Sequence, residues 1–188
     1  MAKRPIKFGV KNVHIAKVTE DAAGAITYGT PFAAPGIVAL TLDPQAETVE
    51  ENADDITWFY DENNNGYNGN AEFEQLPDEY FTEILGWAKN TNGVLIEKAD
   101  AVSSPFAIMF EFTVGGDATV TGKRGCMFYC YGGRPSVSGN TKTNTIAPDH
   151  ESVSIRAIPR PTDAAVKASA LSSDAAYASW FTAVPEAN

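Results

Sequence analysis

The chain has few of the residues from which most catalytic and metal sites are built. Its 188 residues include only two cysteines and two histidines. His14 and His150 stand alone in sequence, and neither lies beside a serine or cysteine nucleophile motif. Motifs that hold phosphates, dinucleotides or a catalytic zinc ion are missing as well. The sequence therefore predicts a protein that is not an enzyme and that uses no cofactor.

Positive charge is also scarce, with 14 Lys and Arg against 24 Asp and Glu and a formal net charge of −10. A general nucleic-acid binder normally carries a basic stripe, and none is visible. The longest apolar runs, such as 106–110, are far shorter than the roughly 20 residues of a membrane helix. The basic N-terminus has no apolar stretch after it, unlike a secretion signal. We expect a protein that is made in the cytoplasm and does not enter a membrane.

The two cysteines, Cys126 and Cys130, lie in a stretch that is typical of a β-strand. At this spacing on a strand they would share one face, roughly 13 Å apart. A disulfide needs Cα atoms within about 7 Å of each other. The spacing predicts two free, buried thiols.

The chain is rich in short runs of alternating apolar and polar residues, which Gly, Asn and Pro separate. Strands are expected over 12–19, 37–42, 56–60, 71–76, 94–97, 106–113, 118–131, 143–158 and 166–171. A helix is predicted in mid-chain, because apolar residues recur at helical spacing between Pro77 and Gly86. A second, short helix is expected after Ser173. This pattern favours one mainly β domain over 1–188, an antiparallel sandwich or barrel with a packed helix.

Three segments are predicted to lie outside the strands. Residues 1–9 read as an N-terminal arm, and 162–188 as a C-terminal arm with a strand and a helix. Each arm binds either a neighbouring subunit or its own core. Residues 43–55 are polar and acidic, and we expect a long loop there, with a pair of exposed, twisted strand ends as the alternative.

One stretch matches the calcium-loop pattern D-x-[DN]-x-[DN]-G-x5-E. Its candidate ligands are Asp61, Asn63, Asn65 and Glu72, and Gly66 would supply the sharp turn. The flanks, however, read as strands rather than helices. A β-hairpin turn with Asn-Gly chemistry explains the same residues, so both interpretations remain open.

The order of several motifs resembles one family, the major tail proteins (tail tube proteins) of siphophages that infect Gram-positive bacteria. An Ala-Asp pair leads into an aromatic strand over 53–60, an Asn-Gly-Tyr-x-Gly stretch follows at 65–69, and a Leu-Pro-Asp helix ends in Leu-Gly at 76–86. Residues 8–13 and 125–132 resemble further family motifs. The chain departs from the pattern at Trp58-Phe59, and the acidic stretch 44–52 has no residue-by-residue match.

The resemblance implies a structural subunit of the virion. Such subunits form hexameric rings that stack into the non-contractile tail channel through which DNA is ejected. It implies a β-sandwich of the tail tube type, with a flanking helix, whose inner sheet continues into the neighbouring subunit. The implied partners are other copies of the chain, a tape measure protein, and tail terminator or baseplate proteins. DNA would pass through the lumen without specific binding.

Within that interpretation, two sets of residues receive roles. The candidates for contacts between rings are Glu47, Val49, Glu50, Glu51, Asp54 and Asp55. The candidates for the lumen are Glu72, Glu74 and Glu111, because acidic side chains would let DNA slide without adhering. Two alternatives stay open. One is the tube of a contractile injection or secretion machine. The other is a monomeric, virion-associated module that binds carbohydrate or calcium, with Trp58 or Trp87 in a ligand groove.

Overall fold

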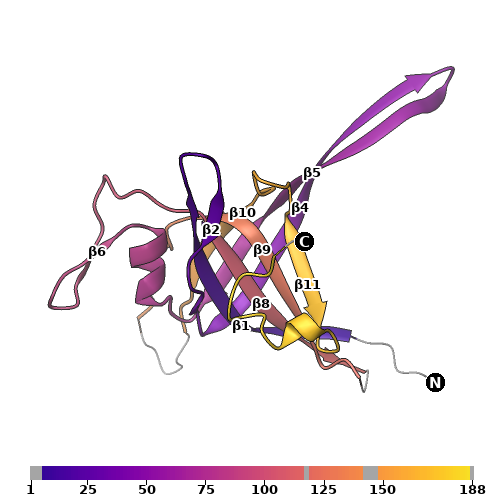
Figure 1. The fold of residues 1–188 in the computed structure, drawn as a ribbon. Helices are drawn as coiled ribbons and strands as arrows, with labels where there is room; N and C mark the ends of the chain where they lie inside the picture. The colour runs from indigo at the N-terminus through magenta and orange to yellow at the C-terminus, as the bar shows by residue number, and fades with distance from the viewer. Residues whose placement is uncertain (1–5, 117–118, 142–147, 187–188) are drawn as a thin grey trace.

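The computed structural model describes residues 6–116, 119–141 and 148–186, and it is mainly β, as the alternation predicts (Figure 1). Every strand pairing in it is antiparallel. The strands are β1 (Ile6–Glu20), β2 (Ile26–Tyr28), β3 (Phe32–Ala33), β4 (Ile37–Ala53), β5 (Ile56–Phe73), β6 (Ala88–Lys89), β7 (Leu95–Ile96), β8 (Phe106–Gly115), β9 (Gly122–Gly132), β10 (Glu151–Ala157) and β11 (Lys167–Leu171). The helical elements are a π-helical turn, η1 (Tyr80–Ile84), and a 3-10 turn, η2 (Ala175–Tyr177).

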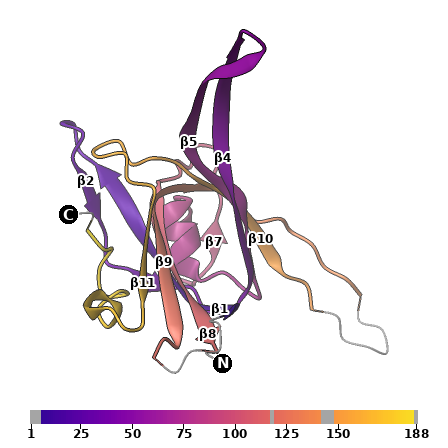
Figure 2. The ribbon, with the colours of Figure 1, turned by 90° about the vertical axis from the view of Figure 1, so that its right-hand side faces the viewer.

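The main sheet has the order β2-β1-β8-β9-β10-β5-β4, and it forks at β9. One end of β9, residues 130–132, pairs with β10, whereas residues 123–127 pair with β11. The two branches diverge, so that the sheet curves over on itself without closing (Figure 2). Among the described residues, β4 and β11 therefore each pair on one side only. The result is an open sandwich rather than a closed barrel.

A first hydrophobic core fills the space inside the curved sheet. Phe73, Phe106 and Ile108 are buried in it. The turn η1 packs against the same core through Tyr80, whose ring meets Phe106 edge-on at 6.2 Å between centroids. The Tyr80 hydroxyl donates a hydrogen bond of 3.0 Å to the carbonyl of Gly133. The predicted mid-chain helix is thus present, but its assigned turn is shorter than 77–86.

A second core lies on the other face of β8 and β9. Met109 and Phe128 are buried there beneath the C-terminal segment, together with Trp180. The Trp180 indole N–H donates a 3.3 Å hydrogen bond to the carbonyl of Gly125. The described part of the C-terminal arm therefore docks on its own core. The helix expected after Ser173 is only the 3-10 turn η2, and the strand expected over 166–171 is β11.

The cysteines are both free and buried, as predicted. They do not share a face, however, because Cys126 belongs to the second core and Cys130 to the first. The cause is a shift in register where β8 and β9 pair, between Phe106 and Ile108. One extra residue in β9 turns the following side chains to the opposite face.

The N-terminal arm is shorter than expected. Residues 6–9 belong to β1, and Ile6 pairs with Gly115 of β8. Residues 1–5 of the predicted arm, and the start of the predicted strand at 143–147, lie outside the described residues. No helix in the described part is long and apolar enough to cross a membrane.

Candidate assembly surfaces

The acidic segment 43–55 is not a loop but one half of a long β-ribbon. Strands β4 and β5 pair from Ile37 opposite Phe73 to Ala53 opposite Ile56. Asp54 and Asp55 connect them with φ angles of 53° and 60°, as in a type I′ turn. Of the two interpretations of this segment, the exposed pair of strand ends is confirmed and the long loop is wrong.

The ribbon leaves the body of the protein where β10 ends. β10 pairs with β5 only over residues 67–73. The preceding residues of β5, 56–66, therefore pair with β4 alone. From here on, the arm without further qualification means residues 46–64 of this ribbon, not the N-terminal or C-terminal segment. It projects far from the sandwich, at the upper right of Figure 1. All of its side chains are exposed. A two-stranded ribbon of this kind is only marginally stable in water by itself.

The glycines of the 65–69 stretch form no hairpin turn, although the sequence suggested one. Gly66 sits in β5 with a φ of 92°, at a register shift opposite Pro44 and Ala46. A Cβ atom on Gly69 would lie 1.8 Å from the Thr41 carbonyl oxygen, and one on Gly66 would lie 2.0 Å from that of Ala157. These glycines let β5 fit closely between β4 and β10 at the root of the arm.

The calcium-loop interpretation is wrong, because the segment is an extended strand and not a loop. Asp61, Asn63 and Asn65 follow one another along an extended strand, and Glu72 lies in the body of the sheet. At about 3.3 Å per residue, Asp61 and Glu72 are roughly 36 Å apart along β5. These residues cannot surround one ion. Across the described ranges, no three His, Cys, Asp or Glu side chains gather as a metal site would need.

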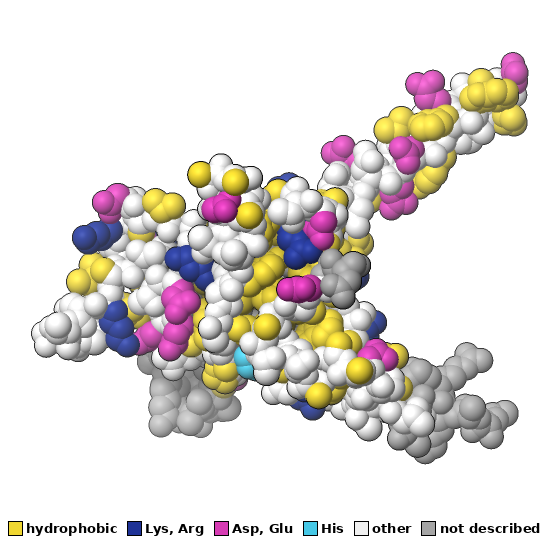
Figure 3. Space-filling model, in the orientation of Figure 1, with side chains coloured by type: hydrophobic (Ala, Val, Ile, Leu, Met, Phe, Trp, Pro, Cys, Tyr) yellow, Lys and Arg dark blue, Asp and Glu magenta, His cyan; other side chains and the backbone are white. Residues whose placement is uncertain are grey.

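The arm combines exposed apolar side chains with acidic ones. Trp58 has 71% of its surface exposed, and Val49, Ile56, Phe59 and Tyr60 are each more than half exposed. The arm also carries seven acidic residues and no Lys or Arg: Glu47, Glu50, Glu51, Asp54, Asp55, Asp61 and Glu62. Figure 3 shows yellow and magenta atoms alternating along it. Exposed clusters of large apolar side chains are a common feature of interaction sites.

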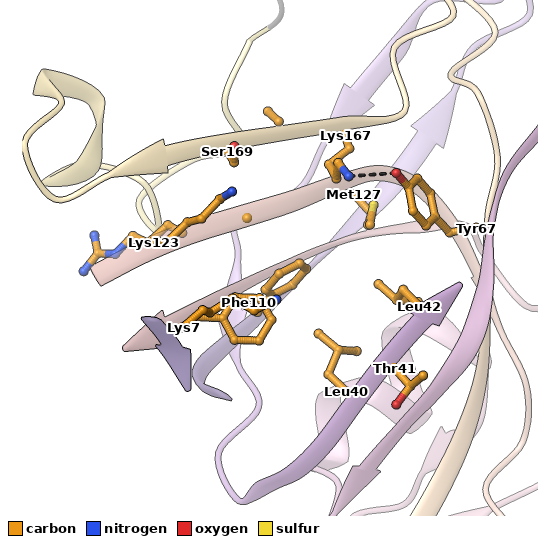
Figure 4. Close-up of a pocket in the computed structure, with 14 residues that line it drawn as sticks. Lys7, Leu40, Thr41, Leu42, Tyr67, Phe110, Lys123, Met127, Lys167 and Ser169 are labelled. Atoms are coloured by element: carbon orange, nitrogen blue, oxygen red, sulfur yellow. Dashed lines mark hydrogen bonds between the residues drawn. The ribbon is translucent and has the colours of Figure 1, made fainter. Parts of the chain in front are cut away.

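A groove of about 350 Å³ lies where the sandwich fails to close, between β4 and β11. Its apolar wall is made by Leu40 and Leu42 of β4, facing Phe110 of β8 across the gap (Figure 4). Its charged residues are all basic: Lys7, Lys123, Arg124 and Lys167. We call this space the basic groove.

Among the described residues, the three lysines of the basic groove have no anionic partner. Lys167 donates a 2.7 Å hydrogen bond to the Tyr67 hydroxyl, and the Lys7 ammonium lies 4.2 Å from the centre of the Phe112 ring. Within the ranges that the structure describes, neither these two nor Lys123 forms an ion pair. Their charge is available to an incoming acidic group.

Glu111, one of the three lumen candidates, is buried with only 6% of its surface exposed. Its carboxylate lies 2.9 Å from Arg124 Nε and 3.3 Å from Lys11 Nζ, and it accepts a 3.2 Å hydrogen bond from Asn12. Burial would raise the pKa of this carboxyl, but the hydrogen bonds from Asn12, Arg124 and Lys11 outweigh it and lower the pKa. Glu111 does not present a free charge to a channel, so that prediction is wrong. It lies on the face of β8 that also carries Met109 of the second core, and the C-terminal segment covers this face.

The same network fixes Arg124 at the rim of the basic groove. The guanidinium lies over the rings of both Tyr177 and Phe181, 3.8 Å and 4.5 Å from their centres. It also donates to the Tyr177 carbonyl. Arg124 therefore joins β9 to the C-terminal segment, and the lysines remain the adaptable charges of the groove.

The other two lumen candidates lie at the end of β5. Glu72 pairs with Ala39 of β4 and Ser152 of β10, and it points away from the core that Phe73 enters. Glu74 follows the strand, exposed, with His150 Nε2 at 3.5 Å. The sheet face around Glu72 carries small polar side chains in register with it: Thr41, Asn68, Asn70, Ser152 and Ser154. Two charged residues share this face, Asp43 and Arg156, and both pair with Asn68.

The sequence did not reveal the basic groove, because its lysines come from β1, β9 and β11 and are brought together only by the fork at β9. The uneven spread of charge, with no base between 46 and 64, was the one available signal. No protein-family model matches the chain, and a search of curated proteins finds no match either.

Proposed function

We propose that the chain is a structural subunit that assembles with copies of itself into a hollow tube, the tail tube of a siphophage. The arm carries this proposal. It holds the exposed Trp58, Phe59 and Tyr60 outside the body of the protein, on a ribbon that has no packing partner within the described chain. A monomer gains nothing from exposing these side chains, whereas a polymer buries them.

The open edges of the sheet support the same proposal. Unpaired edge strands are a hazard to a monomer, because another chain can pair with them. Here β4 and β11 both leave such an edge. In a ring, each edge strand meets the neighbouring subunit, and backbone pairing at these edges holds the subunits together.

The polar face of β4, β5 and β10 is our candidate for the lumen. Its residues are mostly small and uncharged, and its charged members, Asp43, Glu72 and the exposed Arg156, leave it with a net negative charge that disfavours phosphate. DNA would pass such a wall without specific binding. By the resemblance noted above, a tape measure protein would fill the channel before DNA does, and terminator or baseplate proteins would close its ends.

A monomeric carbohydrate-binding module gains less support from the placement of the tryptophans. Trp58 lies on the arm, and Trp87 is half-buried against Phe81, with 4.9 Å between ring centroids. Neither lines the basic groove.

Replacing residues 46–64 by a two-residue Asn-Gly turn tests the proposal. Both cores lie outside the arm, so the variant should fold and melt at nearly the same temperature as the parent chain. Electron microscopy of the two proteins at equal concentration should show tubes for the parent and none for the variant. Equal polymerisation by both would reject the role of the arm.

A further inference from the structure

We infer that the basic groove is the receptor for the tip of the arm of a second copy of this chain. The inference rests on the proposed self-assembly and adds its second half, the surface that the arm binds. It would place the outer end of one subunit's ribbon between β4 and β11 of the next.

Charge complementarity is the first support. The arm carries seven acids and no base, whereas the groove is lined by four of the chain's 14 basic residues and by no acid. The groove thus gathers more than a quarter of the basic residues of a chain whose net charge is −10. Opposite charges gathered on two surfaces favour their encounter and fix their orientation.

The apolar chemistry of the two surfaces also matches. The tip presents Trp58, Phe59 and Tyr60, and the groove offers Leu40, Leu42 and Phe110 beneath its rim of lysines. Aromatic side chains that enter an apolar pocket within a charged rim are typical of the strongest contacts in protein interfaces. Figure 4 shows Leu40, Leu42 and Phe110 beside the open space between β4 and β11.

The arm cannot occupy the groove of its own chain. Tyr67 lines the groove and also marks the root of the arm, so the ribbon starts there and extends outward. Phe59 lies eight residues further along β5, roughly 26 Å from Tyr67. Figures 1 and 2 both show the ribbon directed away from the body. The occupant must therefore come from another copy.

Charge reversal on both surfaces tests the inference. One variant carries Lys123→Glu and Lys167→Glu, a second carries Glu50→Lys and Glu51→Lys, and a third carries all four changes. Glu50 and Glu51 are adjacent on β4, so reversing both covers the two faces of the ribbon. Lys98→Glu is the control, because Lys98 is exposed and lies outside the groove. Sedimentation over a range of concentrations measures assembly, and thermal unfolding verifies the fold.

Each two-residue reversal should raise the protein concentration needed for assembly by about tenfold or more, because like charges then meet. The four-residue variant should return toward the parent value, and Lys98→Glu should leave it nearly unchanged. Assembly should also weaken as salt screens the contact.

Two results would overturn the inference while leaving the proposed function in place. In the first, loss of the arm abolishes assembly but the Lys123→Glu, Lys167→Glu variant assembles like the parent. In the second, that variant assembles normally but loses binding to duplex DNA, measured by fluorescence anisotropy, which would make the groove a phosphate site. If tubes form equally well without the arm, the role of the arm fails together with the inference, and if neither protein forms tubes, the proposed function itself fails.

Discussion

Pro44 and Tyr67 face each other across β4 and β5, and this pair marks where a three-stranded sheet becomes a two-stranded ribbon. Of the β5 residues that also pair with β10, Tyr67 is the one nearest the arm, and its partner there is Ala157. Pro44 lies in β4, an edge strand of the described sheet, and prolines within sheets are largely confined to such strands. Gly66 adds a bulge beside the pair, and bulges bend the strand that carries them. The direction of the arm is therefore set at its root.

The close packing at the root predicts a strong effect of Gly69→Ala. The new methyl group would lie 1.8 Å from the Thr41 carbonyl oxygen, so β4 and β5 would have to separate. We expect the free energy of unfolding to fall by about 3 kcal/mol, measured by urea denaturation. Gly139→Ala is the matched control, because a Cβ there meets no atom within 4 Å. Equal stability of the two variants would contradict the packing described here.

Glu111 predicts a specific dependence of stability on pH. Its pKa is lower in the folded chain than the ordinary glutamate value of 4.5, so the unfolded chain takes up the proton first as the pH falls. Its stabilisation is therefore complete above pH 4.5 and is lost as the pH drops through the lower folded pKa.

Glu111→Gln should remove this part of the acid sensitivity. At neutral pH the variant should be less stable by about 2 kcal/mol, because Arg124 loses its buried anionic partner. Thermal melting between pH 7 and pH 3 is the measurement, and Asp100→Asn, at an exposed residue, is the control. A variant that loses as much stability in acid as the parent would argue against the network.

Trp58 predicts an optical signal for assembly. Its side chain is 71% exposed, whereas Trp180 is only 4% exposed. A blue shift of tryptophan emission on assembly should therefore come mainly from Trp58. Trp58→Ala should abolish the shift and raise the assembly concentration by about tenfold or more. Val137→Ala, at a residue off the arm that is even more exposed than Trp58, should do neither.

The turn at the tip of the arm allows a comparison of two variants that carry the same net charge. Asp54 and Asp55 both need positive φ, which Asn-Gly adopts readily and proline cannot. Asp54→Asn with Asp55→Gly should preserve the ribbon, whereas proline at both positions should open its tip. The two variants lose the same two carboxylates, so any difference between their assembly concentrations reports the shape of the tip. Identical values would show that the ordered tip is not required.

Much of the fold was predictable because alternation directly reports which residues face a core. Phe106, Ile108 and Phe110 alternate as expected on β8, and Val153 and Ile155 do so on β10. The expected strand and apolar stripe were therefore found at 106–113 and at 80–85. Alternation fails where both faces are buried, as in β9, and there a single bulge placed Cys126 and Cys130 in different cores.

The arm was the hardest element to predict, because it has no core to face. A strand was expected only at 56–60, whereas the other residues of the arm are mostly acidic or polar and fully exposed, which is the composition of a loop. Its order comes from pairing with the partner strand, a long-range property that local composition does not carry. The same holds for the basic groove, since nothing local to Lys7, Lys123 or Lys167 indicates that β4 and β11 leave a gap between them.

Electron microscopy of the purified full-length protein at rising concentration tests the central claim most directly. Self-assembly through the arm predicts rings, and then hollow tubes, about ten nanometres wide as an order of magnitude for six domains of this size. A single monomeric species at every concentration and salt condition would contradict it.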